Sequence, residues 1–265
     1  MYVYLDLRVA RTERVSPSMV RVTLTGDRVD EFASGGRDQR FKLFLPHPHQ
    51  DAPVVPPITD DSWFAAWQAM DAAERAVMRT YTVRAQRPGE LDVDFALHGD
   101  GGPASRWAAS AVPGDRVGVL GPASAENEAI DFRPPPDATT YLLAADETAL
   151  PAVAGILAWL PPGARALVWI EGARQDLATE ADAEITWVVP GGTVPAVRAA
   201  ALPPIDYAWI AGESGGVKAL RRHLVNERGL DRRAVKFTGY WRRGSSEEDM
   251  LAEVVAGGTP HLDED

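Results

Sequence analysis

The chain has 265 residues, 45% of them apolar, and its 38 acidic and 27 basic residues give a formal net charge of −11. This length suits two domains with a core each, and the charge argues against nucleic-acid binding, which needs a basic surface. Cysteine is absent, which excludes disulfides, thiolate nucleophiles and cysteine-held iron–sulfur centres. No apolar run approaches the roughly 20 residues of a membrane span, so we expect a cytoplasmic protein without stable membrane association. Nothing in the sequence indicates a subunit interface, so we expect a monomer.

The first half of the chain alternates apolar and polar residues with the period of β-strands. The clearest alternation lies at 3–9, 20–24 and 91–97, and shorter candidates lie at 41–45, 81–85 and 115–120. Six such strands separated by turns predict a small antiparallel β-barrel of the Greek-key type. A helix is predicted to interrupt them over 60–79, where apolar residues recur near helical spacing at Trp63, Trp67, Met70 and Val77.

The period changes after residues 131–138, a segment with three consecutive prolines that we interpret as a linker. Short apolar runs follow at 140–145, 166–172, 185–189, 207–212 and 234–240, separated by helical stretches at 149–160, 193–201 and 216–228. Buried strands alternating with helices predict a Rossmann-like parallel sheet with flanking helices. The expected fold is a two-domain β plus α/β chain, with domains at 1–133 and 134–265.

The strand near residue 81 carries an unusual mixture of side chains. In an extended strand Arg79, Tyr81 and Val83 point to one face. An aromatic ring beside a fixed cation could stack on a planar cofactor while Arg79 neutralises the phosphate of that cofactor.

A second candidate site lies in "LHGDGGPASRWAA" (97–109), where a strand and a glycine turn precede a short helix that begins at Ala104 or Ser105. The N–H groups at a helix N-terminus bind anions, so this segment predicts a pyrophosphate cradle. The alternative is a hairpin-like turn followed by a helix that a serine caps.

The second half lacks the three spaced glycines of a standard Rossmann dehydrogenase, since its first strand leads into "LLAADETALPAVAGIL". Ligands should still approach the carboxyl ends of the parallel strands. These ends carry residues 145–148, Glu171, residues 190–192 and the glycine-rich turn at 212–216.

Four segments, "RTYTVR", "LDVDFALHGDGGPASRWA", "AADETALPA" and "GYWRRG", follow one another along nearly the whole chain. Together they resemble the siderophore-interacting protein family, FAD-dependent ferric-siderophore reductases of the ferredoxin-reductase-like superfamily. The resemblance implies that the barrel domain binds FAD through Arg79, Tyr81, Thr82, Arg84, His98, Gly102, Ala104, Ser105 and Trp107. It also implies that the second domain binds NADPH or NADH, with Asp146, Glu147, Thr148, Gly212 and Glu213 on the nicotinamide side and an aromatic residue, Tyr240 or Trp241, close to the flavin.

The choice between NADH and NADPH stays open at the level of sequence. Glu171 follows the second parallel strand, where a carboxylate accepts ribose hydroxyls and repels a 2′-phosphate. Arg174, three residues later, could bind that phosphate. The family resemblance favours NADPH slightly.

The expected reaction transfers electrons from the nicotinamide through flavin to the ferric iron of a siderophore, which then releases Fe(II). It requires no metal-binding or catalytic side chain of the protein. Basic residues of the last third could attract an anionic ferric siderophore, and we assign this role to Lys218, Arg222, Lys236 and Arg242. The alternative is a solvated helix face paired with Glu227 and the acidic tail.

Two other functions share parts of this pattern. A general flavin or ferredoxin-type reductase would pass its electrons to a protein partner and show little preference for iron chelates. A non-enzymatic siderophore-binding module would lack bound flavin, and the presence of Arg79, Tyr81 and Thr82 argues against it.

Overall fold

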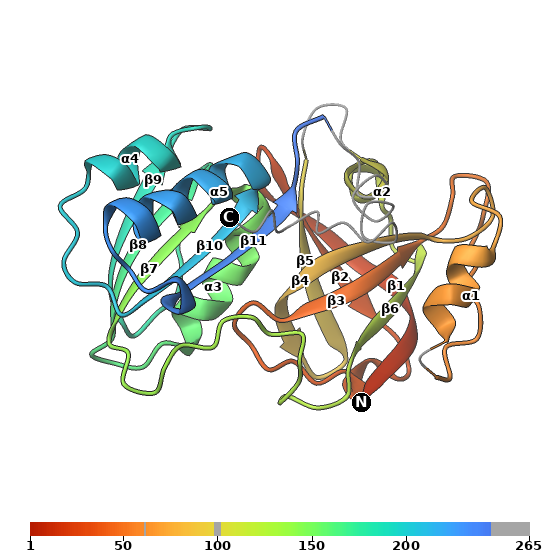
Figure 1. Cartoon of the computed structure of the whole chain (residues 1–265). Helices are drawn as coiled ribbons and strands as arrows, with labels where there is room; N and C mark the ends of the chain where they lie inside the picture. Colours follow the sequence, from red (N-terminus) through yellow and green to blue (C-terminus); the bar gives the residue numbers. More distant parts are fainter. Residues whose placement is uncertain (61, 98–101, 245–265) are drawn as a thin grey trace. The chain divides into compact units, whose positions relative to one another are not determined.

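The computed structural model describes residues 1–60, 62–97 and 102–244. The chain divides into two compact units, Met1–Ile130 and Asp131–Asp265. Strands β1–β6 belong to the first unit and strands β7–β11 to the second (Figure 1). Within the described ranges, no helix is long and apolar enough to cross a membrane.

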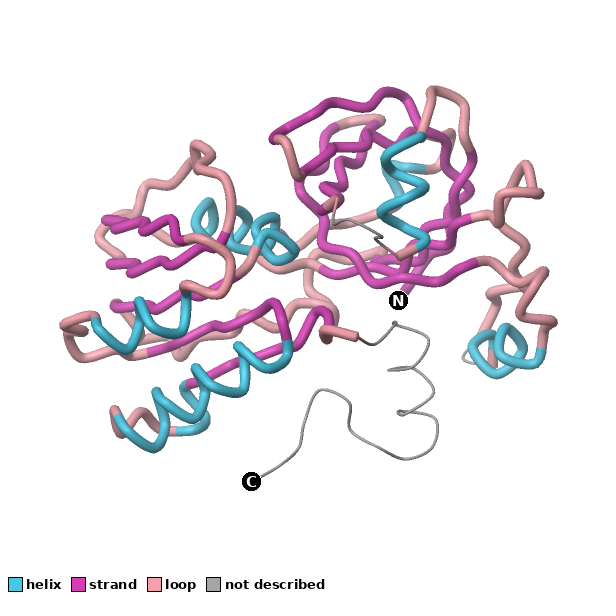
Figure 2. The backbone as a smooth tube through the Cα atoms, turned by 90° about the horizontal axis from the view of Figure 1, so that it is seen from above, coloured by secondary structure: helices cyan, strands magenta, loops and turns pink. Residues whose placement is uncertain are grey.

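The first unit is a closed barrel of six antiparallel strands. They are β1 (Tyr2–Ser16), β2 (Met19–Thr25), β3 (Arg40–Leu45), β4 (Val77–Arg87), β5 (Glu90–Ala96) and β6 (Arg116–Pro122). They close in the order β1-β2-β5-β4-β3-β6, and Figure 2 shows the ring of strands from above. Alternate residues of each strand, such as Leu5, Leu7, Val93 and Phe95, fill the interior. The predicted six-stranded Greek-key barrel is confirmed.

The short helices of the first unit are α1 (Trp63–Ala69), α2 (Pro103–Ser110) and the 3-10 turn η1 (Val29–Glu31). The helix predicted over 60–79 is wrong beyond Ala69. Asp71 starts a turn in which its carbonyl accepts N–H bonds from Glu74 and Arg75. Val77 then opens β4, where it pairs with Leu45 of β3, because barrel pairing outweighs the helical spacing of the apolar residues.

The second unit is built on a parallel sheet of five strands in the order β11-β10-β7-β8-β9. The strands are β7 (Thr140–Ala145), β8 (Arg165–Glu171), β9 (Asp182–Val188), β10 (Tyr207–Glu213) and β11 (Val235–Trp241). The helices are α3 (Leu150–Trp159), α4 (Thr193–Ala199) and α5 (Ser214–Arg222), with 3-10 turns η2 (Glu147–Ala149) and η4 (Arg232–Ala234) and a π-helical turn, η3 (His223–Glu227).

Both faces of this sheet are covered by helices. Leu143 and Ala145 of β7 belong to the core under α3, whereas Leu142 and Ala144 belong to the core under α4 and α5. This arrangement confirms the predicted Rossmann-like sheet with flanking helices. The segment that we interpreted as a linker is anchored to it, since Phe132 is fully buried and packs against aromatic rings of β7 and β10.

Candidate cofactor sites

Tyr81 lies in the middle of β4 and is half-buried against the barrel core. Its ring centroid is 4.5 Å from that of Phe95 on β5, and the Phe95 ring is 5.7 Å from that of Trp107 on α2. This row of three rings, Tyr81–Phe95–Trp107, brings together the two segments that the sequence marks for flavin binding. Sequence reasoning missed the connecting role of Phe95, because alternation identifies it only as a core residue.

Arg79 and Thr82, the other residues of this motif on β4, are both buried. The Arg79 guanidinium donates a 2.8 Å hydrogen bond through Nη1 to the Met78 carbonyl. Thr82 lies opposite Arg40 of β3 in the strand register. An arginine fork and a hydroxyl beside an aromatic ring are a donor set that fits the phosphate and carbonyl oxygens of FAD.

Helix α2 begins after Gly102, which provides no side-chain cap, and its first turn contains no acidic residue. The first intrahelical bond runs from the Arg106 N–H to the Gly102 carbonyl. The N–H groups of Ala104 and Ser105 precede it and have no intrahelical partner, so they fit a phosphate group.

Ser105 stands inside this helix, and its hydroxyl donates to the Ala96 carbonyl at the end of β5. The alternative of a serine-capped helix is therefore wrong. The hydroxyl instead fixes α2 to the barrel. His98, which the resemblance assigns to the same segment, lies outside the described residues.

Arg84 belongs to a different environment from Tyr81. It lies at an irregularity in the pairing of β4 with β5, and its Nε is 3.7 Å from the Asp94 carboxylate. The same carboxylate accepts hydrogen bonds of 2.7 and 2.9 Å from Arg21. Burial and the charge of Arg21 lower the pKa of Arg84. The structure thus places Arg84 in a charge network with Asp94 and Arg21. Its role in binding FAD stays a prediction.

In the second unit, Asp146 connects three segments by hydrogen bonds at the carboxyl ends of the strands. Its Oδ1 accepts hydrogen bonds from the N–H and hydroxyl of Thr148. Its Oδ2 accepts 2.8 Å bonds from the Glu213 N–H and from the indole Nε1 of Trp241. Burial raises the pKa of Asp146. The structure therefore brings four sequence-predicted residues together.

Two positions at this edge require glycine, because an acidic side chain lies close to the backbone at each of them. Gly212 has φ of 139°, and a Cβ there would lie 2.6 Å from Oδ2 of Asp146. Gly172 also has φ of 139°, and a Cβ there would lie 2.3 Å from Cγ of Glu147. Glu147 in turn accepts a 3.2 Å bond from the Ala173 N–H. Only glycine combines this backbone conformation with the lack of a side chain.

In the turn at 212–216 an acidic side chain caps the helix that follows. The Glu213 carboxylate accepts a 2.9 Å hydrogen bond from the Gly216 N–H and so caps α5. A side chain of the protein thus occupies the position that a ligand anion would take at this N-terminus.

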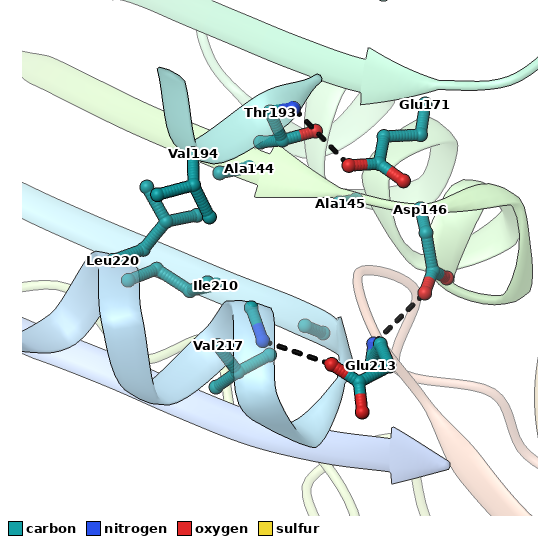
Figure 3. A pocket seen from close by; sticks show the side chains of 12 residues that line it. Ala144, Ala145, Asp146, Glu171, Thr193, Val194, Ile210, Glu213, Val217 and Leu220 are labelled. Carbon is teal, nitrogen blue, oxygen red and sulfur yellow. Dashed lines mark hydrogen bonds between the residues drawn. The ribbon is translucent and has the colours of Figure 1, made fainter. Parts of the chain in front are cut away.

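A pocket opens beside these residues at the carboxyl ends of β7 and β10, between α4 and α5 (Figure 3). Its polar lining consists of Asp146, Glu171, Glu213 and Thr193. Glu171 accepts hydrogen bonds of 2.9 Å from the Gly191 N–H and 3.1 Å from the Thr193 N–H. Sequence reasoning found Glu171 but missed Thr193, although it directly follows the noted Pro-Gly-Gly turn.

The four basic residues assigned to substrate binding do not form one cluster. Lys218 and Arg222 are exposed and one turn apart on α5. Lys236 lies near the beginning of β11 and pairs with Asp131 at 3.1 Å. Arg242 follows the end of the same strand, so the two are separated by about 20 Å at the usual rise per strand residue. Their assignment to one substrate site stays a prediction.

Comparison with known proteins agrees with this arrangement. Residues 8–126 match the family described as the siderophore-interacting FAD-binding domain, and residues 138–244 match the siderophore-interacting protein family. The NADPH-dependent ferric-chelate reductase of Escherichia coli is 34% identical, over 89% of this chain and 92% of the relative. The ferric vibriobactin reductase ViuB of Vibrio cholerae is 31% identical, over 91% and 90%.

A solved siderophore utilization protein from T. fusca is 36% identical, covers 92% of this chain and 95% of its own, and superposes with a TM-score of 0.78. The two family matches together span most of the chain, one on each unit. This chain therefore belongs to the siderophore-interacting protein family, and its first unit is an FAD-binding domain of that family.

Proposed function

We propose that this chain is an FAD-dependent ferric-siderophore reductase that draws electrons from a reduced nicotinamide nucleotide and releases Fe(II) in the cytoplasm. The observation that carries the proposal is the aromatic row Tyr81–Phe95–Trp107. It joins the donor-rich strand β4 to the uncapped N-terminus of α2, within a unit that matches an FAD-binding family.

In this proposal Tyr81 and Thr82 hold the ring end of FAD and Arg79 neutralises a phosphate of the cofactor. The N–H groups of Ala104 and Ser105 bind its pyrophosphate. When bound, FAD accepts two electrons from a nicotinamide and gives them up singly, which suits one-electron reduction of Fe(III). The residues of the chain supply position and charge. The second unit holds the nucleotide at the carboxyl ends of its strands, beside Asp146, Glu171 and Glu213.

The iron needs no ligand from the protein, because the siderophore itself holds Fe(III) through oxygen donors and holds the softer Fe(II) less well. Lys218 and Arg222 on α5 and Arg242 after β11 are the basic residues that we retain for attracting an anionic chelate. Lys236 is left out because it lies near the beginning of β11, at the opposite end of the strand from Arg242. We propose that the enzyme acts as a monomer, which gel filtration tests.

A turnover assay tests the proposal: the FAD-loaded chain is mixed with NADH or NADPH, a ferric siderophore and a chromogenic Fe(II) chelator. We expect nucleotide oxidation with two Fe(II) trapped for each nucleotide, since each nucleotide gives two electrons and each Fe(III) takes one. The basic residues predict a lower KM for an anionic tricatecholate than for a neutral trihydroxamate, with a difference that shrinks as salt is added.

The same assay separates the alternative functions. If the nucleotide reduces the flavin but the ferric chelates stay oxidised, a reductase that serves a protein partner replaces the proposal. If the purified chain binds no FAD, the proposal fails altogether.

A further inference from the structure

The pocket between α4 and α5 combines an acidic rim with an apolar wall. Asp146, Glu171 and Glu213 supply three carboxylates, and the wall contains aliphatic side chains such as Ile210, Val217 and Leu220. Among the described residues, no lysine or arginine lines this pocket. Its ligand should therefore offer hydroxyl groups and an apolar surface, and it should carry no additional negative charge at this point.

The side-chain hydroxyl of Thr193 is a polar group of the pocket that makes no hydrogen bond within the described part of the chain. The side chain of Thr193 is 5% exposed. A buried hydroxyl without a partner destabilises the folded state, and buried polar atoms are nearly always bonded to protein, water or ligand. Thr193 lines the pocket, so a bound molecule can provide the missing partner.

Glu171 is held next to this hydroxyl. Its Oε1 accepts from the Thr193 N–H at 3.1 Å (Figure 3). Its Oε2 accepts from the Gly191 N–H at 2.9 Å. These two bonds fix the carboxylate and leave further acceptor capacity on both oxygens. A fixed carboxylate beside a hydroxyl matches the two neighbouring hydroxyl groups of a ribose, as at the ends of parallel strands that bind nucleotides.

We infer that Glu171 and Thr193 bind the 2′- and 3′-hydroxyl groups of an adenosine ribose, and that they make this chain prefer NADH to NADPH. The inference rests on the proposed function for its choice of nucleotide. A 2′-phosphate would bring a dianion next to three carboxylates and would replace the hydroxyl that Glu171 recognises. Arg174, the sequence candidate for binding that phosphate, is exposed and does not line the pocket.

Calorimetric titration of the full chain with two nicotinamide-free fragments, ADP-ribose and 2′-phospho-ADP-ribose, tests the inference. We expect ADP-ribose to bind at least about tenfold more tightly. Thr193→Val should weaken ADP-ribose binding about three- to tenfold, the value of one neutral hydrogen bond. Its Tm should not fall, since the hydroxyl makes no bond in the free protein.

Thr179→Val is the matched control. The Thr179 hydroxyl donates a 2.7 Å bond to the Leu157 carbonyl and lies outside the pocket. Its removal should lower the Tm and leave the affinity for ADP-ribose unchanged. The two variants should therefore differ in opposite ways: Thr193→Val loses affinity for ADP-ribose at unchanged Tm, and Thr179→Val loses Tm at unchanged affinity.

Three results would overturn the inference: equal affinity for the two fragments, no binding of ADP-ribose at millimolar concentration, or unchanged affinity in Thr193→Val. None of these measurements uses iron, FAD reduction or a hydride donor. The proposed reductase activity can be measured separately with chemically reduced protein, so the two claims fail independently.

Discussion

Asp146 shows at the scale of a single residue how the acidic edge of the parallel sheet is organised. Asp146 is the acceptor in all four of its hydrogen bonds, and each carboxylate oxygen accepts two of them. An asparagine would have to turn its NH₂ group toward one of these pairs of donors. The side chain is thus specified as a carboxylate although burial raises its pKa.

We predict that Asp146→Asn lowers the free energy of unfolding by about 1–3 kcal/mol, because at least one backbone N–H loses its acceptor even if the Thr148 hydroxyl rotates to accept from the new NH₂ group. Asp206→Asn is the control. One oxygen of Asp206 accepts all three of its bonds, from Thr139 and Thr140, and an asparagine can keep that oxygen in place. Urea unfolding of the two variants measures the difference. Equal losses would contradict the argument.

The sequence located the acidic residues at this edge but not what they do. Glu213 and Glu171 were expected to face a ligand; both line the pocket, and each also accepts a hydrogen bond from a backbone N–H group in the first turn of a helix. These contacts depend on how each turn folds back over the sheet, which residue spacing does not encode. Thr193 was missed for the same reason, since an unpartnered hydroxyl can be recognised only after all its neighbours are placed.

At the scale of elements, the aromatic row Tyr81–Phe95–Trp107 connects β4, β5 and α2. Phe95 is 1% exposed and contacts both of the other rings. A rigid contact of this kind orients the strand and the helix that we propose for FAD binding.

We predict that Phe95→Leu weakens FAD binding severalfold, because Tyr81 and Trp107 lose the ring between them, and that it lowers stability by about 1–2 kcal/mol. Flavin fluorescence titration measures the affinity. Phe44→Leu is the control: Phe44 is equally buried on β3 but contacts Tyr4 and Trp63. It should cost similar stability without loss of FAD. Equal effects on FAD affinity would refute the role of the row.

Most elements could be predicted from the sequence, because alternation and buried apolar runs mark strands directly. The run at 140–145 coincides with β7, and the other parallel strands differ by a few residues at their ends. The prediction failed where two patterns overlapped. Val77 continues the helical spacing of α1, yet it pairs with Leu45 in the barrel. Only the tertiary partner decides between these structures.

At the scale of the whole molecule, each of the two units has its own core and its own candidate ligand. The first matches an FAD-binding family and the second the siderophore-interacting protein family. The net charge of −11 repels anionic chelates at long range, so any attraction must come from local basic residues such as Lys218 and Arg222. The proposed function therefore requires both units, whereas the nucleotide preference concerns only the second.

The central claim is that flavin held by this chain reduces siderophore-bound iron, and a donor-free single turnover tests it most directly. The FAD-loaded chain is reduced with dithionite under anaerobic conditions, freed of excess reductant and mixed with a ferric siderophore and an Fe(II) chelator. We predict return of the oxidised flavin spectrum together with two trapped Fe(II) for each FAD. Flavin that stays reduced while the ferric chelate persists would contradict the account.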